Sequence, residues 1–246
     1  MFARYAYPPN ELGYCGTGDG RELLEYASAA SAPDSAVRPG GSTVVARSAR
    51  GFDGAWPYLD YLAAAAGADS ALDVRVVEAY WIGNELLDAV DPTSFIGAAR
   101  TAFAGQLGAD WRALAPGMLA RPVPNHCFHV FTVYPWVGVL RRTGAHQALE
   151  VLERCRIRWG RVKSLEEDMV TVLSRPLTWD GAAIGLGEPR PERARLAAAG
   201  RSLTPVVRPG DLVALHWDWV CDTLSDRQYE QLRQVTRRQL QLTNRT

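Results

Sequence analysis

The spacing of apolar residues along this chain changes near residue 154, from intervals of three or four residues to short continuous runs. Before that point the apolar positions fall on one face of a helix, within alanine-rich segments. Three of these segments begin at an aspartate, a residue that accepts hydrogen bonds from the first backbone amides of a helix. The pattern therefore predicts three helices, at residues 53–67, 73–90 and 91–108.

Two further segments in this half have helical spacing, residues 21–31 and 125–154. Pro135 should bend or split the second segment, because proline lacks the amide that a helix interior needs. Residues 31–51, which follow the first segment, are polar and rich in glycine and proline. That composition predicts a loop.

The second half of the chain has apolar runs that are short, rich in β-branched and aromatic residues, and divided by Gly, Pro and Asp. Such runs predict strands, here at residues 156–165, 169–179 and 211–220. Residues 225–242 return to helical spacing, and Ser225 is suited to cap that helix.

Together these elements predict an α+β fold. We expect a helical N-terminal domain over residues 1–150, followed over residues 151–246 by a small OB-like β-barrel with a C-terminal helix. At 246 residues, of which 47% are apolar, the chain can bury one large core or two smaller ones.

Composition and charge exclude several classes of function. Basic and acidic residues number 27 each, and the basic ones are almost all arginines without a long run, so nucleic-acid binding is not expected. No apolar stretch is long enough for a membrane span, and the first residues lack the pattern of a secretory signal. The four cysteines form no CxxC pair, which predicts thiols rather than disulfides. We therefore expect a cytoplasmic protein.

The last predicted strand carries two polar residues, His216 and Asp218, in an otherwise apolar run. Alternation along a strand puts them on one face, with Leu215, Trp217 and Trp219 on the other. We expect the three apolar residues to fill the barrel core. Asp218 should then orient the ring of His216 toward a cleft between the barrel and the helical domain. A solvated strand face would also explain the pattern.

Two short motifs lie near the two ends of the predicted barrel. The first is Cys, then Gly five residues later, followed by a basic and an aliphatic residue. The second is Gly, with Val three residues later and His three after that. Their residues are Cys155, Gly160, Arg161 and Val162 in the first, and Gly210, Val213 and His216 in the second. With the helix that follows, residues 155–240 resemble the HypC-type hydrogenase maturation chaperones. The whole chain is similar to an uncharacterised family with a helical N-terminal region.

The resemblance implies an iron ion that carries cyanide and carbon monoxide ligands, with Cys155 and His216 as the protein residues involved. It also implies a partner, either a hydrogenase-assembly protein or the large subunit of a nickel-iron hydrogenase. Thiolate is a strong donor for iron, and neutral imidazole complements it. In the small chaperones the cysteine is at the free N-terminus, whereas Cys155 is internal. A buried cysteine can also serve only as a small apolar residue.

The helical half has a second set of candidate ligands. His126 and His129 are three residues apart, so on a helix they share a face and suit one metal. Glu78, among apolar and aromatic neighbours, is a candidate third ligand, acid or base. Such a set resembles a two-histidine, one-carboxylate iron site. Equally, the histidines can be polar groups satisfied in a core. Cys15, in a glycine-rich turn at 13–20, is a further candidate ligand.

Two functions of different classes stay open at this stage. The first is a non-enzymatic accessory protein that binds iron or a hydrogenase-assembly partner, with the helical half as docking platform or as a built-in substitute for that partner. The second is a non-haem metal-dependent enzyme with its site in the helical half. A metal-free binding module is a third interpretation.

Overall fold

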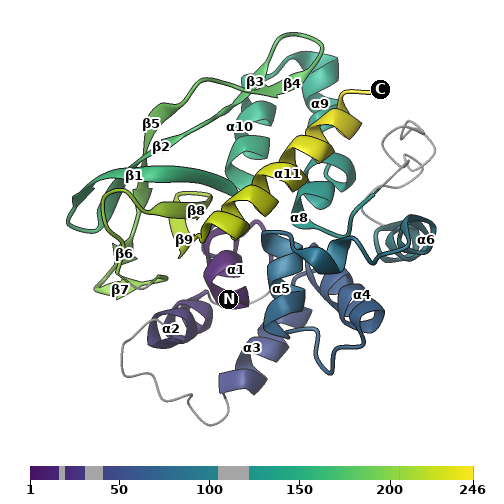
Figure 1. Ribbon diagram of the computed structural model, residues 1–246, viewed down its shortest axis with the longest axis horizontal. Coiled ribbons are helices and arrows are strands. Elements are labelled where there is room, and N and C mark those ends of the chain that lie inside the picture. Colours follow the sequence, from purple (N-terminus) through teal and green to yellow (C-terminus); the bar gives the residue numbers. More distant parts are fainter. Residues whose placement is uncertain (17–19, 31–40, 105–121, 205, 246) are drawn as a thin grey trace.

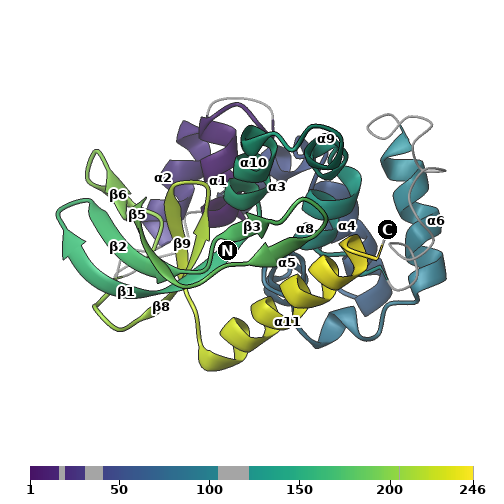
Figure 2. The same cartoon turned by 90° about the horizontal axis from the view of Figure 1, so that it is seen from above.

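A computed structural model describes residues 1–16, 20–30, 41–104, 122–204 and 206–245 of the chain. Strands gather at one end of the molecule and helices at the other, and the C-terminal helix α11 (Asp226–Thr243) lies along both (Figures 1 and 2). The predicted class, a mixed fold of helix and sheet with a C-terminal helix, is confirmed.

Helices dominate the described part of the chain before residue 156. They are α1 (Phe2–Glu11), α2 (Arg21–Ala30), α3 (Gly41–Arg50), α4 (Trp56–Ala66), α5 (Val74–Trp81), the 3-10 turn η1 (Glu85–Leu87), α6 (Pro92–Ala102), α8 (His126–Phe128), the π-helical turn η3 (His129–Val133), α9 (Trp136–Thr143) and α10 (His146–Cys155).

The caps predicted from the sequence explain where two of these helices begin. Asp73 accepts a hydrogen bond from the backbone amide of Arg75 at the start of α5, and Asp91 accepts one from Ser94 at the start of α6. The predicted division at Pro135 is also confirmed, because η3 ends before it and α9 begins after it. Helix α5 stops at Trp81, well short of the predicted residue 90.

The prediction of a loop at residues 31–51 is wrong for its second half, where α3 lies; residues 31–40 are outside the described residues. Val45 and Ala49 are four positions apart and buried, so packing against α1 and α2 stabilises a helix that local composition disfavours. Helix α1 was also not predicted, and it contains Pro8 and Pro9.

Five strands form a closed barrel in the order β1, β2, β5, β9, β8. Neighbouring strands are antiparallel except for the pair β5 and β9, which is parallel. The barrel strands are β1 (Arg158–Glu166), β2 (Met169–Ser174), β5 (Arg190–Arg195), β8 (Leu212–His216) and β9 (Trp219–Thr223). Two short hairpins flank them, β3 (Leu177–Trp179) with β4 (Ile184–Leu186), and β6 (Ala197–Ala198) with β7 (Arg201–Ser202).

Small aliphatic side chains fill one apolar cluster within the barrel. They are Val162, Val170, Val172, Ala194, Val207, Val213, Leu215 and Val220. A second, larger cluster joins the helices to side chains from the other face of the barrel strands, including Trp159, Ala214 and Trp219. Along the barrel strands, these side chains that do not point into the barrel therefore point toward the helices. The candidate site lies at this interface between the barrel and the helices.

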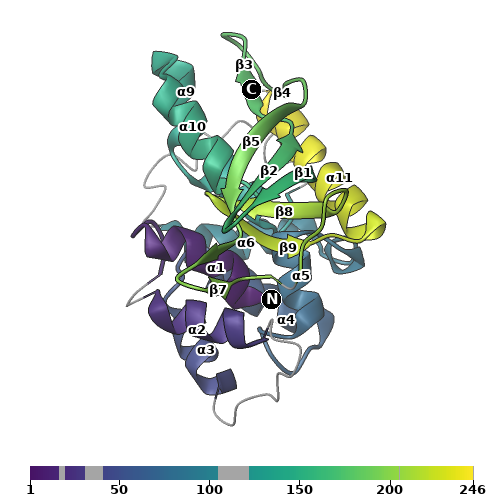
Figure 3. The same cartoon turned by 90° about the vertical axis from the view of Figure 1, so that its left-hand side faces the viewer.

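Helices from the described part of the chain lie beside the strands. Figure 3 shows α11 along one flank, α10 along another and α1 below the strands. Helix α11 begins at a capping box, in which Ser225 and Gln228 satisfy each other's backbone amides. Its buried residues include Leu232, Val235 and Leu240. Among the described residues, no helix combines the length and apolar character needed to cross a bilayer.

Candidate metal centre

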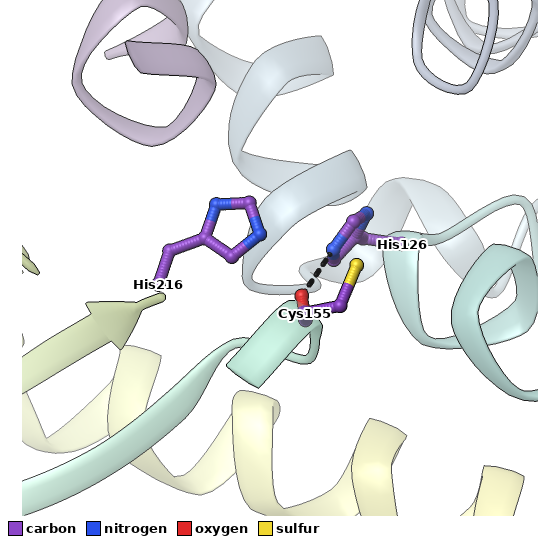
Figure 4. A group of neighbouring side chains, drawn as sticks. All are labelled: His126, Cys155 and His216. Carbon is purple, nitrogen blue, oxygen red and sulfur yellow. Dashed lines mark hydrogen bonds between the residues drawn. The ribbon is translucent and has the colours of Figure 1, made fainter. Parts of the chain in front are cut away.

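Three potential metal ligands from distant parts of the chain meet between the barrel and the helices. They are His126 at the start of α8, Cys155 at the end of α10 and His216 at the end of β8. Their ligand atoms all lie within 4.8 Å of one another, and all three residues are buried. Figure 4 shows the imidazoles of His126 and His216 facing each other, with the thiol of Cys155 beside His126.

Asn125 fixes the position of His126. Its side-chain oxygen accepts a hydrogen bond from the backbone amide of Cys127 and so caps α8. Its side-chain amide donates to the carbonyl of Ala79 in α5. The asparagine is fully buried, so these bonds attach the first turn of α8 firmly to α5.

Arginine side chains hold the end of α10 against the barrel. Arg158 on β1 donates to the carbonyls of Glu153 and Arg154 in α10 and to the carbonyl of Trp217, next to His216. Arg156 forms an ion pair with Glu153 and donates to the carbonyl of Arg175. Because Arg158 donates both to the end of α10 and to the turn after β8, it holds together the two segments that carry Cys155 and His216.

The hydrogen bonds of His216 leave one ring nitrogen free to bind a metal. Nδ1 lies 2.7 Å from the carbonyl oxygen of Tyr5, which can only accept, so Nδ1 carries the proton. Burial lowers the pKa of His216 well below its ordinary value, so the ring is neutral and Nε2 holds a bare lone pair. Nε2 is buried and has no hydrogen-bond partner among the described residues. Metal-binding histidines commonly have this arrangement, with the second nitrogen donating to a carbonyl.

His126 has its tautomer fixed by similar bonds. Nε2 lies 2.8 Å from the carbonyl oxygen of Cys155 and donates to it, which leaves the lone pair on Nδ1. The hydroxyl of Tyr80 is 3.1 Å from Nδ1 but only 2.7 Å from the carbonyl of Gly54. One hydroxyl proton cannot serve both acceptors, so when it goes to Gly54 the lone pair of Nδ1 has no donor. Nε2 is the nitrogen on the side of His216 (Figure 4), so an ion bound by His126 at this face would replace its hydrogen bond to Cys155. Burial lowers the pKa of His126 to about 4.

The thiol of Cys155 needs a cation before it can ionise. Burial raises its pKa well above the ordinary value, because a thiolate in these apolar surroundings has no solvent to stabilise it. A bound divalent ion would supply that stabilisation and displace the thiol proton. Binding of a metal here should therefore release a proton and strengthen as the pH rises.

The donors fit a transition-metal ion. Two neutral imidazoles and one thiolate suit zinc, iron or copper rather than magnesium or calcium. Ligands of a tetrahedral ion lie roughly 3.5 Å apart, so a spread of 4.8 Å leaves about an ångström to close. The ligands also border an inner cavity of about 20 Å³, enough for one water-sized occupant.

The structure brings together only some of the predicted site residues. Glu78 is not in the cluster, because its carboxylate accepts hydrogen bonds from Asn84, Gln228 and Arg227. Its position therefore does not support the predicted set of His126, His129 and Glu78.

Two further candidates, His129 and Cys15, both border the inner cavity. His129 bonds through Nδ1 to the hydroxyl of Tyr58, and the thiol of Cys15 lies 3.2 Å from the hydroxyl of Tyr134. They lie near the three ligands but outside the group of atoms that could share one ion.

The predicted role of Asp218 is wrong. Strand β8 ends at His216, and Trp217 and Asp218 form the turn to β9, with φ of 52° at Trp217. The alternation of a strand therefore stops before Asp218, which is half exposed and pairs with Arg154. Tyr5, not Asp218, orients His216.

The tryptophans of this hairpin also do not fill the barrel. Trp217 and Trp219 belong to the larger cluster shared with the helices, and Leu215 alone of the three predicted residues packs inside the barrel. Trp217 stacks on Tyr14, and Trp219 contacts Tyr7 edge to face. The prediction that His216 faces the helical half holds, since its ring contacts Trp81 and His126.

Comparison with known proteins gives one match. A family model described as a family of unknown function (DUF6390) covers residues 1–246. The chain belongs to this family. No curated protein and no solved structure matches it.

Proposed function

We propose that this protein is a HypC-like accessory protein of metallocentre assembly, which binds an iron ion at His126, Cys155 and His216. The observation that carries the proposal is the meeting of Cys155 and His216. The resemblance to the HypC-type chaperones selected these two residues from opposite ends of the barrel segment, and their ligand atoms lie within 4.8 Å of each other and of His126. In this proposal the closed barrel with its terminal helix is an OB-like HypC-type domain.

In this proposal the helical half takes the place of the separate partner protein that helps to hold the iron ion in the small chaperones. His126 belongs to α8, and its tautomer is set by the carbonyl of Cys155. A site completed within one chain holds its ion without a second protein. Cys155 is internal and buried, so the ion would leave only when the helices and barrel separate around it. The recipient would be a hydrogenase-assembly protein or the hydrogenase large subunit.

An iron ion held at this site would bind small ligands such as cyanide and carbon monoxide. The protein's own residues hold the ion, keep both imidazoles neutral and exclude bulk water. A reducing cytoplasm would keep the four cysteines as thiols. All four are free thiols in the structure.

The test is the metal content and infrared spectrum of the protein purified without oxygen. We expect one iron per chain and absorption bands of bound cyanide and carbon monoxide, both lost in Cys155→Ser and His216→Ala. His146→Ala is the matched control, because this histidine is exposed and far along α10 from the site. Iron or another metal without these bands would contradict a role in hydrogenase assembly. Absence of metal after reconstitution would contradict the site itself.

A metal-dependent enzyme is the second candidate function. It is favoured by a surface cleft that shares residues with the inner cavity. The ligands would be the same three residues. Protein that lacks bound cyanide and carbon monoxide could be tested for oxygen consumption with a small organic substrate. Such activity would favour this function over the first.

A further inference from the structure

A surface cleft of about 430 Å³ leads toward the candidate metal centre. It is lined by the segment after α1, the segment between α3 and α4, and the end of η3 with Pro135. Four residues line both this cleft and the inner cavity: Cys15, Gly54, His129 and Tyr134. They form the boundary between the cleft and the cavity that contains the three ligands.

His129 presents an unpartnered nitrogen at this boundary. The residue is almost completely buried, and its Nε2 has no hydrogen-bond partner among the described residues. Its Nδ1 lies 3.2 Å from the hydroxyl of Tyr58. Buried polar atoms are nearly always paired, so an orphan nitrogen beside a cavity indicates a missing partner.

The tautomer of His129 follows from Tyr58. The phenol is buried, and Nδ1 is the partner that the described residues offer its hydroxyl. If Nδ1 carried the proton, the hydroxyl proton of Tyr58 would be left without an acceptor, which is costly in a buried site. Tyr58 therefore donates to Nδ1, and the proton of the neutral His129 lies on Nε2. The nitrogen at the boundary is a hydrogen-bond donor without an acceptor.

Gly54 keeps the space in front of this donor open. A Cβ atom at position 54 would lie 2.8 Å from Nε2 of His129, closer than carbon and nitrogen normally approach. The backbone of Gly54 is fixed, because its carbonyl accepts the hydroxyl of Tyr80 at 2.7 Å. Any side chain at this position would fill the space next to Nε2.

We propose that a small anion reaches this boundary from the cleft, binds the metal ion with one atom in the inner cavity, and accepts a hydrogen bond from Nε2 of His129. The volume of about 20 Å³ limits the size of the ligand. Its chemistry follows from the two orphan nitrogens: His216 offers a lone pair to a cation, and His129 offers a proton to an acceptor. A small anion that binds the cation satisfies both. This inference rests on the proposed metal site.

Azide binding to the cobalt-substituted protein tests the inference. Azide is a triatomic anion, and the visible bands of bound Co²⁺ report its binding. We expect His129→Leu to weaken azide binding about 10- to 100-fold, the effect of losing one hydrogen bond to a charged group. Gly54→Ala should weaken it as well. His146→Leu is the control, and azide should bind to it as to the unchanged protein.

Cobalt content separates failure of this inference from failure of the metal site. His129 and Gly54 are not proposed ligands, so both variants should bind cobalt in the same amount as the unchanged protein. Equal azide affinity in His129→Leu and the unchanged protein, with cobalt bound in both, would overturn the inference and leave the metal site standing. Absence of cobalt binding in the unchanged protein would overturn both. If His129→Leu does not fold, His129→Phe keeps a ring of similar size without a hydrogen-bond donor, and unchanged azide affinity there would have the same meaning.

Discussion

Acid should destabilise the metal-free protein well before its carboxylates are protonated. The burial of His126 and His129 lowers their pKa values to about 4 and about 3, and burial lowers that of His216 well below 6.5. In the unfolded chain each would have a pKa near 6.5. At pH values between the folded and the unfolded pKa, the unfolded state binds protons that the folded state does not. The free energy of unfolding therefore decreases as the pH falls.

The size of the effect follows from proton binding to the unfolded chain. Between pH 7 and pH 5.5, uptake by one histidine of pKa 6.5 lowers the free energy of the unfolded state by about 1.2 kcal/mol. Three such residues lower the free energy of unfolding by roughly 4 kcal/mol. This is a large share of the 5–15 kcal/mol that is typical of a whole protein.

Urea unfolding at the two pH values, with a chelator present and tryptophan fluorescence as the signal, measures this difference. His146→Gln is the control, because that side chain is largely exposed and should leave the difference unchanged. A change of less than about 1 kcal/mol between pH 7 and pH 5.5 would refute the reasoning, since it would mean that the three rings are not buried as neutral groups.

Three substitutions test other parts of the account, each by chemical denaturation or metal content. Glu153→Ala should cost about 3–5 kcal/mol, because it leaves Arg156 buried without its carboxylate partner; a loss below 1 kcal/mol would contradict this. Gly160→Ala should cost about 1–3 kcal/mol, since its Cβ would lie 2.7 Å from a backbone oxygen of β2; an unchanged midpoint would argue against it. Asp218→Asn should leave metal content unchanged, and loss of metal would restore its predicted role.

Much of the fold follows from local signals in the sequence. The caps at Asp73, Asp91 and Ser225 identify helix starts because each satisfies backbone amides within its own turn. Helix α3 and helix α1 were missed because tertiary burial overrides weak local preference. In α3, Val45 and Ala49 are buried against the neighbouring helices.

The site was only partly predictable. The HypC resemblance selected Cys155 and His216, and the spacing of two histidines selected His126 together with His129 and Glu78, which lie outside the candidate cluster. Which helix end meets which strand end is decided by contacts between distant segments, such as Arg158 with Trp217, that leave no periodic signal.

Two errors have identifiable causes. Asp218 was assigned to the face of His216 because alternation was extended through what is a turn. Tyr5, which orients His216, could not be found from the sequence because it uses only its backbone carbonyl.

The most direct test of the central claim is titration of the metal-free protein with Co²⁺, read by absorption. We predict one ion bound per chain, with a near-ultraviolet sulfur-to-cobalt band that disappears in Cys155→Ser and persists in Cys127→Ser, whose thiol bonds to Thr236 away from the cluster. His126→Ala and His216→Ala should each weaken binding by about a hundredfold or more, because a structural ion gains roughly 3 kcal/mol per ligand. A sulfur band that survives in Cys155→Ser, or a histidine variant that binds Co²⁺ as tightly as the unchanged protein, would contradict the assignment of His126, Cys155 and His216 as the metal centre.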